Sequence, residues 1–415
     1  MIILSHPTGN QFVRSILIEL NKQKLLSKFH TSIAVYPDTF LEELSKIKLL
    51  GEIKRREFHP DLKEFTSMHF FKEFGRLFLS KFGINFLNQH EVGFFSIDAV
   101  YRHIDRKASK DVSAKKNIKA VYAYEDAAFA SFSKAKKENI LCIYDLPIAY
   151  WETLRSFLAF EAERLPDWAV TLRGGIKDSA QKLERKCKEL EMADMVVIPS
   201  SFVQESLPSW AANKQIIISP FGSPAYLNES VETNNSKTSQ NNPLRVLFVG
   251  SMGQRKGLAD LFEAIKLLPK GSVELVVMGS LQTTLSFYKS QHVDFIYEPG
   301  RPHHEVLTLM KSCDVFCLPS IVEGRALVMQ EAMSQGLPVI ITPNTGGADL
   351  IIEGETGFLV PIRRPDVIAE KINWFVENRS QIPQMGERAK QHAMQYTWEN
   401  YRKTIVNSIV QQIKS

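Results

Sequence analysis

The chain has 415 residues, of which 44% are hydrophobic and 23% charged, and its formal net charge is +5. This length exceeds one ordinary core and fits two α/β domains, and the composition is that of a soluble globular protein. The small positive charge suits an anionic ligand or an anionic membrane surface, but it is too weak to indicate a nucleic-acid-binding protein.

The four cysteines, Cys142, Cys187, Cys313 and Cys317, predict free thiols rather than a disulfide framework. Cys313 and Cys317 lack a second Cys or His pair at metal-ligand spacing, so no metal site is predicted. The N-terminus has no signal-peptide pattern, and no apolar run reaches the ~18 residues of a membrane span. We therefore expect a cytoplasmic protein, either free or at the inner face of the membrane.

A polar segment from Tyr226 to Pro243 divides the chain. We interpret it as a linker or mobile loop between an N-terminal domain of residues 1–225 and a C-terminal domain of residues 244–397. The last stretch, residues 398–415, has helical periodicity, and we expect it to pack back on the first domain.

Short continuous apolar runs alternate with helical patterns in both domains. In the C-terminal domain the runs are 244–250, 273–279, 293–297, 314–320, 338–342 and 357–361. In the N-terminal domain the pattern is less regular, with runs at 2–6, 30–37, 120–124, 140–145 and 195–200. Such runs predict parallel strands covered by helices on both faces. The predicted fold class is α/β, with two doubly wound Rossmann-like domains facing across a cleft that receives the ligands.

The segment Phe65–Leu87 is rich in Phe with interspersed Lys and Arg, and it follows the basic residues Lys54–Arg56. One interpretation is a peripheral membrane surface, in which rings insert and cations meet acidic lipids. The other is an amphipathic helix that buries its rings on the first sheet.

The most informative segment runs from Leu318 to Pro361. A strand ending at Pro319 is followed by the loop IVEGR and by a helix, ALVMQEAMSQ, that Gly336 ends. The loop and the first helical turn leave backbone N–H groups free at the carboxyl edge of the sheet, where a phosphate could be held. Gly324 would let the backbone approach that ligand closely.

Two acidic residues of this segment can face one cleft, since Glu323 lies in the loop and Glu331 lies about one and a half turns into the helix. Carboxylates accept hydrogen bonds from paired hydroxyls such as those of a sugar or a ribose. The alternative is that both are ordinary helix-face glutamates, because Glu is a good helix former.

Two further turns follow strands of the same domain. In VGSMGQRKG, the cations Arg255 and Lys256 could neutralise a departing diphosphate, or they could be solvated loop residues. Gly346 and Gly347 form a turn that could bring the backbone close to a ligand.

The string EGRALVMQEAMSQGLPVI, with its E-x7-E pair, resembles the signature of the retaining glycosyltransferases of family 4, which have the GT-B fold. The resemblance runs from VGSMGQRKG to the terminal TWENYRK and so covers nearly all of the C-terminal half. In the first half, Leu183–Phe202 is similar to the stretch that precedes the family's interdomain crossover.

This resemblance implies that Glu331 binds the donor ribose, that Glu323 holds hydroxyls of the transferred sugar and that Lys256 stabilises the leaving diphosphate. The catalytic candidates are Glu323, Lys256 and Arg255. The other donor-side candidates are Gly250, Ser251, Gly324, Arg325, Ala326, Leu327, Gly346 and Gly347. The family works without a bound metal, and no Asp-x-Asp string occurs in this chain. We therefore expect no metal and no cofactor.

The sequence departs from the family pattern at several positions. Ser251 stands where the family has Arg, and Arg325-Ala326 replaces the common Phe-Gly, so that Arg325 could add a phosphate contact. The acceptor side has Asp145 where the family often has His. The acceptor-side candidates are residues that follow strands of the first domain: His6, Asn10, Glu125, Asp126 and Asp145, of which His6 and Asp145 are preferred.

The resemblance implies retaining transfer of a sugar from a nucleotide diphosphate sugar to a hydroxyl of a glycan or lipid-linked acceptor, in surface polysaccharide or glycolipid synthesis. Two alternatives stay open: a catalytically inactive sugar-nucleotide-binding subunit, which Ser251 and the missing histidine permit, and a sugar-nucleotide epimerase on the same fold. A dinucleotide oxidoreductase and a P-loop kinase are not indicated, because neither G-x-G-x-x-G nor G-x4-G-K-[ST] occurs.

Overall fold

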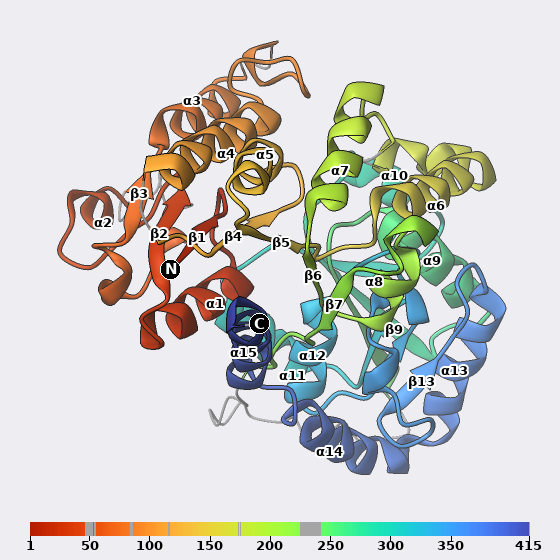
Figure 1. The fold of residues 1–415 in the computed structure, drawn as a ribbon. Helices are drawn as coiled ribbons and strands as arrows, with labels where there is room; N and C mark the ends of the chain where they lie inside the picture. The colour runs from red at the N-terminus through yellow and green to blue at the C-terminus, as the bar shows by residue number, and fades with distance from the viewer. Residues whose placement is uncertain are drawn as a thin grey trace.

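The computed structural model describes residues 1–45, 53, 55–83, 86–114, 117–172, 174, 176–224 and 242–414. These residues form two α/β units, each built on a parallel sheet (Figure 1). The segment interpreted as a linker, residues 226–243, lies outside the described residues except for its last two positions.

The first unit contains a seven-stranded sheet in the order β3-β2-β1-β4-β5-β6-β7. Its strands are β1 (Ile2–Ser5), β2 (Leu26–Thr31), β3 (Thr66–Met68), β4 (Ala120–Tyr124), β5 (Leu141–Asp145), β6 (Met195–Ile198) and β7 (Gln215–Ile218). The helices that follow them along the chain are α1 (Gln11–Lys22), α2 (Phe40–Ser45), α3 (Phe70–Lys81), α4 (Ile97–Ala114), α5 (Phe129–Lys137), α6 (Trp151–Arg164), α7 (Ala180–Met192) and α8 (Ser201–Ser206).

The second unit contains a six-stranded sheet in the order β10-β9-β8-β11-β12-β13. Its strands are β8 (Leu244–Val249), β9 (Val273–Met278), β10 (Phe295–Glu298), β11 (Val315–Leu318), β12 (Val339–Ile341) and β13 (Gly357–Leu359). Its helices are α9 (Leu258–Lys266), α10 (Leu285–Lys289), α11 (His303–Lys311), α12 (Leu327–Ser334), α13 (Pro365–Glu377) and α14 (Ile382–Ala393), and the chain ends in α15 (Trp398–Lys414).

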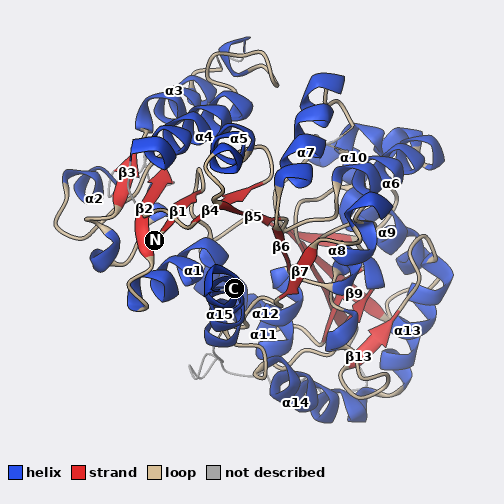
Figure 2. Cartoon of the chain, in the orientation of Figure 1, coloured by secondary structure: helices blue, strands red, loops and turns tan. Residues whose placement is uncertain are grey.

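Both sheets have the strand order of a doubly wound nucleotide-binding fold. In this fold the strands are parallel, and the order in which they are added across the sheet reverses between the first and fourth strands. Helices cover both faces of the sheets (Figure 2). Successive residues of a strand point to opposite faces. Ile2 and Leu4 of β1 accordingly lie in one buried cluster, whereas Ile3 lies in the other. The predicted fold class, two Rossmann-like domains of the GT-B kind, is confirmed.

Three details of the first sheet differ from the prediction. The second strand is β2 at Leu26–Thr31, not residues 30–37. Ile33, Ala34, Val35 and Tyr36 are as buried as strand residues, so hydrophobicity alone did not separate this buried loop from a strand. The edge strands β3 and β7 were not predicted, because β3 has only three residues and the pattern of β7 is half exposed.

The C-terminal helix α15 packs against α1 of the first unit (Figure 1). Ser15 Oγ donates a hydrogen bond to the carbonyl of Trp398 at 3.1 Å. Tyr401, Ile405 and Ile409 are buried in the same cluster as the residues of β1. The last helix therefore completes the core of the first unit, although it follows the second unit in sequence.

A segment after β5 makes the opposite contribution, from the first half of the chain to the second unit. Helix α6 and the 3-10 helix η4 (Pro166–Thr171) precede β6 of the first sheet, yet they pack on the second unit. Trp168 lies in the core cluster of that unit, with its ring 5.8 Å from Phe262 and its Nε1 donating to Gln291 Oε1 at 3.1 Å. Arg164 on α6 forms an ion pair with Asp260 on α9 at 2.8 Å. A stretch inside residues 1–225 thus contributes to the core of the second unit.

None of the helices in the described part of the chain is long and apolar enough to cross a bilayer.

Replacing Trp168 with Ala should destabilise the second unit, because the substitution leaves a large cavity in its core. Large-to-small changes of this kind cost about 3–5 kcal/mol. We expect a clearly lowered midpoint of urea unfolding, followed by far-UV circular dichroism. Trp210→Ala is the matched control, since Trp210 is 46% exposed. Equal losses in the two variants would show that Trp168 contributes no more than a surface ring.

Candidate functional site

Three loops meet at the carboxyl edge of the second sheet. They follow β8, β11 and β12, which are neighbours in the sheet. The amide of Glu323 in the second loop donates to the carbonyl of Asn344 in the third at 3.0 Å, and the amide of Ala326 donates to Thr345 at 3.1 Å. The amide of Ile321 in the second loop donates to the carbonyl of Arg255 in the first at 2.9 Å. The loops that carry the predicted donor-side residues therefore form one continuous surface.

Glu323, Arg255 and Lys256 form a charge cluster at this surface. One carboxylate oxygen of Glu323 lies 2.5 Å from Nη1 of Arg255 and 2.7 Å from Nζ of Lys256. Both cations stand at the end of the 3-10 helix η7 (Gln254–Lys256), which Gly257 closes with a φ of 72°. The structure thus brings together the three residues that the sequence singled out for charge chemistry.

The electrostatics of the cluster favour the charged form of the acid. Burial raises the pKa of Glu323, but Lys256 and Arg255 lower it by more, so the net pKa lies below its ordinary value. Burial lowers the pKa of Lys256, and the carboxylate opposes this shift. Two cations against one carboxylate leave one net positive charge, which attracts an anionic ligand.

The backbone donors at this surface are not all available. Ala326 donates to Thr345, Gly346 to the carbonyl of Pro343 and Gly250 to the carbonyl of Met278, so these predicted phosphate contacts are already engaged. In the described part of the chain, the amides of Gly324 and Arg325 have no such partner. Leu327 begins α12, and the first amides of a helix lack an intrahelical acceptor.

Gly324 also lies at the contact between the two units. A Cβ at this position would lie 1.9 Å from the carbonyl oxygen of Pro147, which belongs to the first unit. Ser200 Oγ donates to the carbonyl of Gly324 at 2.6 Å, and the amide of Ala149 donates to the backbone carbonyl of Glu323 at 3.3 Å. The glycine therefore permits close contact between the two units, a role that only the tertiary structure reveals.

The side chain of Arg325 turns into the protein rather than toward a phosphate. It donates to Gln330 at 2.7 Å, to the carbonyl of Gly346 at 3.0 Å and to Asp349 at 2.7 Å. Its guanidinium also lies over the ring of Tyr396. These contacts join the second and third loops, so the expected phosphate contact of this side chain has no support in the geometry.

Glu331 lies on α12, where it meets a partner that sequence reasoning missed. Its carboxylate accepts a hydrogen bond from Nε2 of His303 at 3.1 Å, and this bond raises the pKa of the histidine. His303 is the first residue of α11 and is partly exposed. The adjacent His303-His304 pair at the start of a helix was the only sequence signal that could have found it.

The remaining donor-side candidates, Ser251 and Gly347, have mainly structural contacts. The carbonyl of Ser251 accepts a hydrogen bond from the amide of Gly253 at 2.8 Å. Gly347 lies close to α12, since a Cβ there would be 2.6 Å from Cε of Met329. Both positions shape their turns.

On the first unit, His6 follows β1 and Asp145 is the last residue of β5, and these two strands flank β4 in the sheet. Tyrosines of β4 lie between them: the ring of Tyr124 is 4.6 Å from that of His6, and the hydroxyl of Tyr122 donates to Asp145 at 2.5 Å. The structure therefore brings the preferred acceptor-side pair to one edge, bridged by aromatic rings.

The two residues have opposite protonation behaviour. Nδ1 of His6 accepts hydrogen bonds from the amides of Gly9 and Thr8 at 2.8 and 3.1 Å, which assigns the proton to Nε2. Burial, aided by Arg56, lowers the pKa of His6 to about 3, so the ring is neutral. Burial raises the pKa of Asp145 to about 7, in the range suited to proton transfer at neutral pH.

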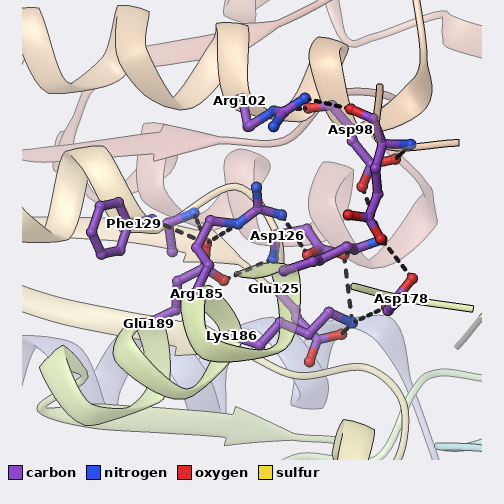
Figure 3. A network of polar contacts seen from close by, with 12 residues as sticks. Asp98, Arg102, Glu125, Asp126, Phe129, Asp178, Arg185, Lys186 and Glu189 are labelled. Atoms are coloured by element: carbon purple, nitrogen blue, oxygen red, sulfur yellow. Dashed lines mark hydrogen bonds and ion pairs between the residues drawn. The ribbon is translucent and has the colours of Figure 1, made fainter. Parts of the chain in front are cut away.

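The other acceptor-side candidates lie elsewhere. Asn10 is exposed at the start of α1, and its side chain makes no capping hydrogen bond. Glu125 and Asp126 belong to a network with α7, in which Lys186 lies 3.0 Å from Glu125 and Arg185 lies 2.8 Å from Asp126 (Figure 3). The network fixes the loop after β4 to α7 and engages both carboxylates in ion pairs.

Among the residues that the structure describes, one group of side chains has ligand atoms close enough together for a metal ion: His90, Glu91 and Asp178, within 4.8 Å of one another. Nζ of Lys182 lies 3.1 Å from the same Asp178 oxygen that Nε2 of His90 approaches at 2.9 Å. The lysine already supplies the positive charge at this carboxylate, so the donor set does not favour a cation.

Comparison with known families gives a match over the C-terminal half. Residues 230–392 match the family described as "Glycosyl transferases group 1". The capsular polysaccharide biosynthesis glycosyltransferase CapM of Staphylococcus aureus is 28% identical over 267 residues, which cover 58% of this chain and 70% of CapM. The putative colanic acid biosynthesis glycosyltransferase WcaL of Salmonella typhimurium is 32% identical over 148 residues, 32% of this chain and 36% of WcaL.

Solved structures are similar over the whole chain. Anabaena HepE in complex with UDP superimposes with a TM-score of 0.61 at 15% identity, covering 99% of each chain. Sucrose-phosphate synthase from Thermosynechococcus elongatus gives a TM-score of 0.63 at 16% identity, covering 100% of this chain and 99% of that one. At these identities the likeness establishes the two-unit fold.

The raised pKa of Asp145 predicts a pH-dependent effect of Asp145→Asn. Between the ordinary pKa of 3.8 and the folded value of about 7, the carboxyl is protonated in the folded state and ionised in the unfolded state. Its contribution to stability is present below this window and is lost as the pH rises through it, by roughly 1 kcal/mol per pH unit. The amide of Asn does not titrate but still accepts the Tyr122 hydroxyl.

Relative to the wild type, Asp145→Asn should therefore gain stability from about pH 4 to about pH 7 and show no further gain above it. Urea unfolding across this range measures the difference. Asp167→Asn, at an exposed position, serves as the control. A pH-independent difference for Asp145→Asn would contradict the raised pKa.

Proposed function

We propose that this protein is a glycosyltransferase that moves a sugar from a nucleotide diphosphate sugar to a hydroxyl acceptor, with retention at the anomeric carbon. The observation that carries the proposal is the cluster of Glu323, Arg255 and Lys256, which lies where three loops meet at the carboxyl edge of the second sheet. This cluster falls within the residues that match the group 1 glycosyltransferase family.

The donor diphosphate would bind through both charge and backbone. Arg255 and Lys256 would neutralise its oxygens, and the amides of Gly324 and Arg325 and the N-terminus of α12 would donate hydrogen bonds. A diphosphate competes with Glu323 for the two cations. Its binding would free the carboxylate to accept hydrogen bonds from hydroxyls of the transferred sugar.

The ribose of the donor nucleotide would lie at Glu331. Its carboxylate suits the paired hydroxyls of a ribose, and the bond from His303 holds it in place. Structures of Anabaena HepE contain UDP, UDP with glucose and UDP-glucose. Its similar fold supports a nucleotide sugar as the donor of this protein.

The retaining reaction that we propose occurs on one face of the sugar. The bond from the anomeric carbon to the phosphate oxygen breaks, the acceptor oxygen bonds to the same face, and the acceptor proton passes to the leaving phosphate. Arg255 and Lys256 supply the positive charge that this leaving group needs, so the proposed mechanism is independent of a metal. The protein otherwise contributes by positioning the two substrates.

The acceptor would enter from the first unit, near His6 and Asp145. Neutral His6 and a carboxyl with a pKa near 7 suit a hydroxyl that must be oriented while its proton passes to the leaving phosphate. The names of CapM and WcaL place those proteins in capsular polysaccharide and colanic acid biosynthesis. We propose a glycan or lipid-linked acceptor in surface polysaccharide synthesis on this basis.

Glu323→Ala tests the role of the carboxylate. We expect sugar transfer to fall by at least ~100-fold, as when one charge-stabilising group is removed from an active site. The affinity for UDP should hold or rise, since the two cations lose their competitor. Turnover of labelled nucleotide sugars and calorimetry with UDP measure the two effects.

Glu370→Ala, on the exposed face of α13, is the matched control for this variant. Thermal melting shows whether each variant is folded. Full turnover by a folded Glu323→Ala protein would refute the assignment of this residue.

Lys256→Met tests the diphosphate contact. The substitution keeps the apolar stem of the side chain and removes its charge. UDP affinity should fall by about tenfold or more, because a charged hydrogen bond contributes about 1.5–3 kcal/mol. Lys266→Met on α9, where the lysine pairs with Glu263 at the surface, should leave UDP affinity unchanged. Unchanged affinity in the Lys256 variant, measured by calorimetry, would place the diphosphate elsewhere.

A further inference from the structure

The Phe-rich segment after β3 does not bury its rings against the first sheet. Phenylalanines of α3 and of the loop that follows it are between 43% and 72% exposed: Phe70, Phe71, Phe74, Phe78, Phe82, Phe86 and Phe94. A helix that covered the sheet with these rings, one of the two interpretations of the sequence, is therefore not what forms. Figure 1 shows α3 and this loop at the outer end of the first unit.

The rings form a continuous stripe along α3. Phe70, Phe74, Phe78 and Phe82 recur every four residues, which places them on one side of the helix. Phe74 lies 6.4 Å from Phe78, and Phe78 lies 4.6 Å from Phe82, between ring centroids. An adjacent side of α3 packs on the protein through Glu73, which is buried and bonded to Arg56 and Arg76.

A basic cavity opens beside this stripe. It has a volume of about 310 Å³ and is lined by Lys72, Arg102, His103 and Arg106, together with Val92, Gly93, Phe94 and Ala99. Its polar side chains are all basic, and none of the lining residues is acidic. Phe94, one of its lining residues, lies 6.4 Å from Phe71, the exposed residue next to Phe70 of the stripe. The apolar stripe and the basic cavity are therefore adjacent parts of one surface.

The carboxylates nearest in sequence do not neutralise these cations. Asp98 pairs with Lys182 at 2.9 Å, and Asp105 accepts the amides of Ala130 and Ser131 at 2.6 and 2.9 Å. Both acids line a second cavity, which shares Arg102 and Arg106 with the basic one.

The cations of the basic cavity are instead held by neutral groups. Arg102 donates to the carbonyls of Asp98 and Glu91 at 3.3 and 2.8 Å. Nζ of Lys72 donates to the carbonyl of Phe94 at 2.8 Å and lies 3.6 Å from the centre of its ring. Arg106 is exposed.

The cations also act on one another. Burial lowers the pKa of Lys72, and repulsion from Arg102 and Arg106 lowers it further. Burial likewise lowers the pKa of His103, and the neighbouring cations Lys107, Lys72 and Arg106 add to this shift. An anion in the cavity would relieve this repulsion.

We propose that α3 and the loop of residues 86–97 form a membrane-docking surface, in which the phenylalanine stripe enters the lipid and the basic cavity receives the phosphate of an anionic phospholipid. Two properties commit the surface to this partner. Exposed rings beside clustered cations match the apolar interior and the charged headgroups of an anionic membrane. The cavity is also large enough for a phosphate and lies at the edge of the stripe, where a headgroup would lie.

Co-sedimentation of the full chain with vesicles tests the proposal and needs no sugar donor, so its outcome does not depend on the proposed function. We expect binding to vesicles of equal parts phosphatidylcholine and phosphatidylglycerol, and binding at least tenfold weaker to pure phosphatidylcholine. Raised salt should weaken the binding to anionic vesicles, because it screens the charges.

Two double variants test the phenylalanine stripe and the basic cavity separately. Phe74→Ser with Phe78→Ser should reduce binding to the mixed vesicles at least tenfold, with Phe40→Ser, an exposed ring on α2, as the control. Arg102→Gln with Arg106→Gln should also reduce it about tenfold or more. The matched charge control is Lys134→Gln with Lys137→Gln on α5.

The Arg102 substitution removes hydrogen bonds to backbone carbonyls, so a loss of binding by the double variant could come from a folding defect. Arg106→Gln alone, at an exposed position, removes a cation of the cavity without breaking these bonds and should also weaken binding.

Glycerol 3-phosphate distinguishes a lipid from a soluble phosphate, since it lacks the acyl chains and should displace the protein from vesicles only weakly. Equal binding to neutral and anionic vesicles, no binding to either, or unchanged binding by both double variants would overturn the proposal. Complete displacement by glycerol 3-phosphate would assign the cavity to a soluble ligand instead.

Discussion

The arrangement of the donor side depends on one carboxylate that holds two neighbouring cations. Arg255 and Lys256 adjoin in sequence, and burying such a pair is unfavourable unless an anion accompanies them. Glu323 is that anion, and it reaches them from a different loop. A diphosphate that binds adds a second anion to the site and competes with Glu323 for the two cations. The net positive charge of the cluster favours this second anion, and the carboxylate then changes partners.

The same loop also joins the two units. Gly324 touches Pro147, and its carbonyl accepts a hydrogen bond from Ser200, so the residues beside the charge cluster are held by the first unit. Trp168 makes the reverse connection, since it follows the first five strands yet packs in the core of the second unit. Small movements of one unit against the other would therefore shift Glu323 directly. The charge cluster thus lies at the contact between the units, and both units hold it in place.

The outer end of the first unit exposes apolar and basic side chains next to one another. Contiguous exposed apolar surface is rare on soluble monomers and marks a place of interaction. Here the exposed rings of α3 stand beside cations that form no ion pair within the described residues, whereas the acids nearby are engaged with Lys182 or with backbone amides. The second cavity continues from this surface to Asp126, in the loop after β4. A membrane bound at α3 would thus lie on the first unit, which we propose binds the acceptor.

The sequence by itself determined the two parallel sheets and the motifs at their carboxyl edges, because strands buried on both faces form continuous apolar runs and fixed short loops follow them. It also grouped Glu323 with Arg255 and Lys256. Tertiary structure alone decided that residues 33–36 are a buried loop, that Gly324 faces Pro147, that Arg325 turns toward Asp349 and that the phenylalanines of α3 face outward. Each of these outcomes depends on residues distant in the chain, and a local pattern records that a side chain is apolar or charged but not which neighbour it will meet.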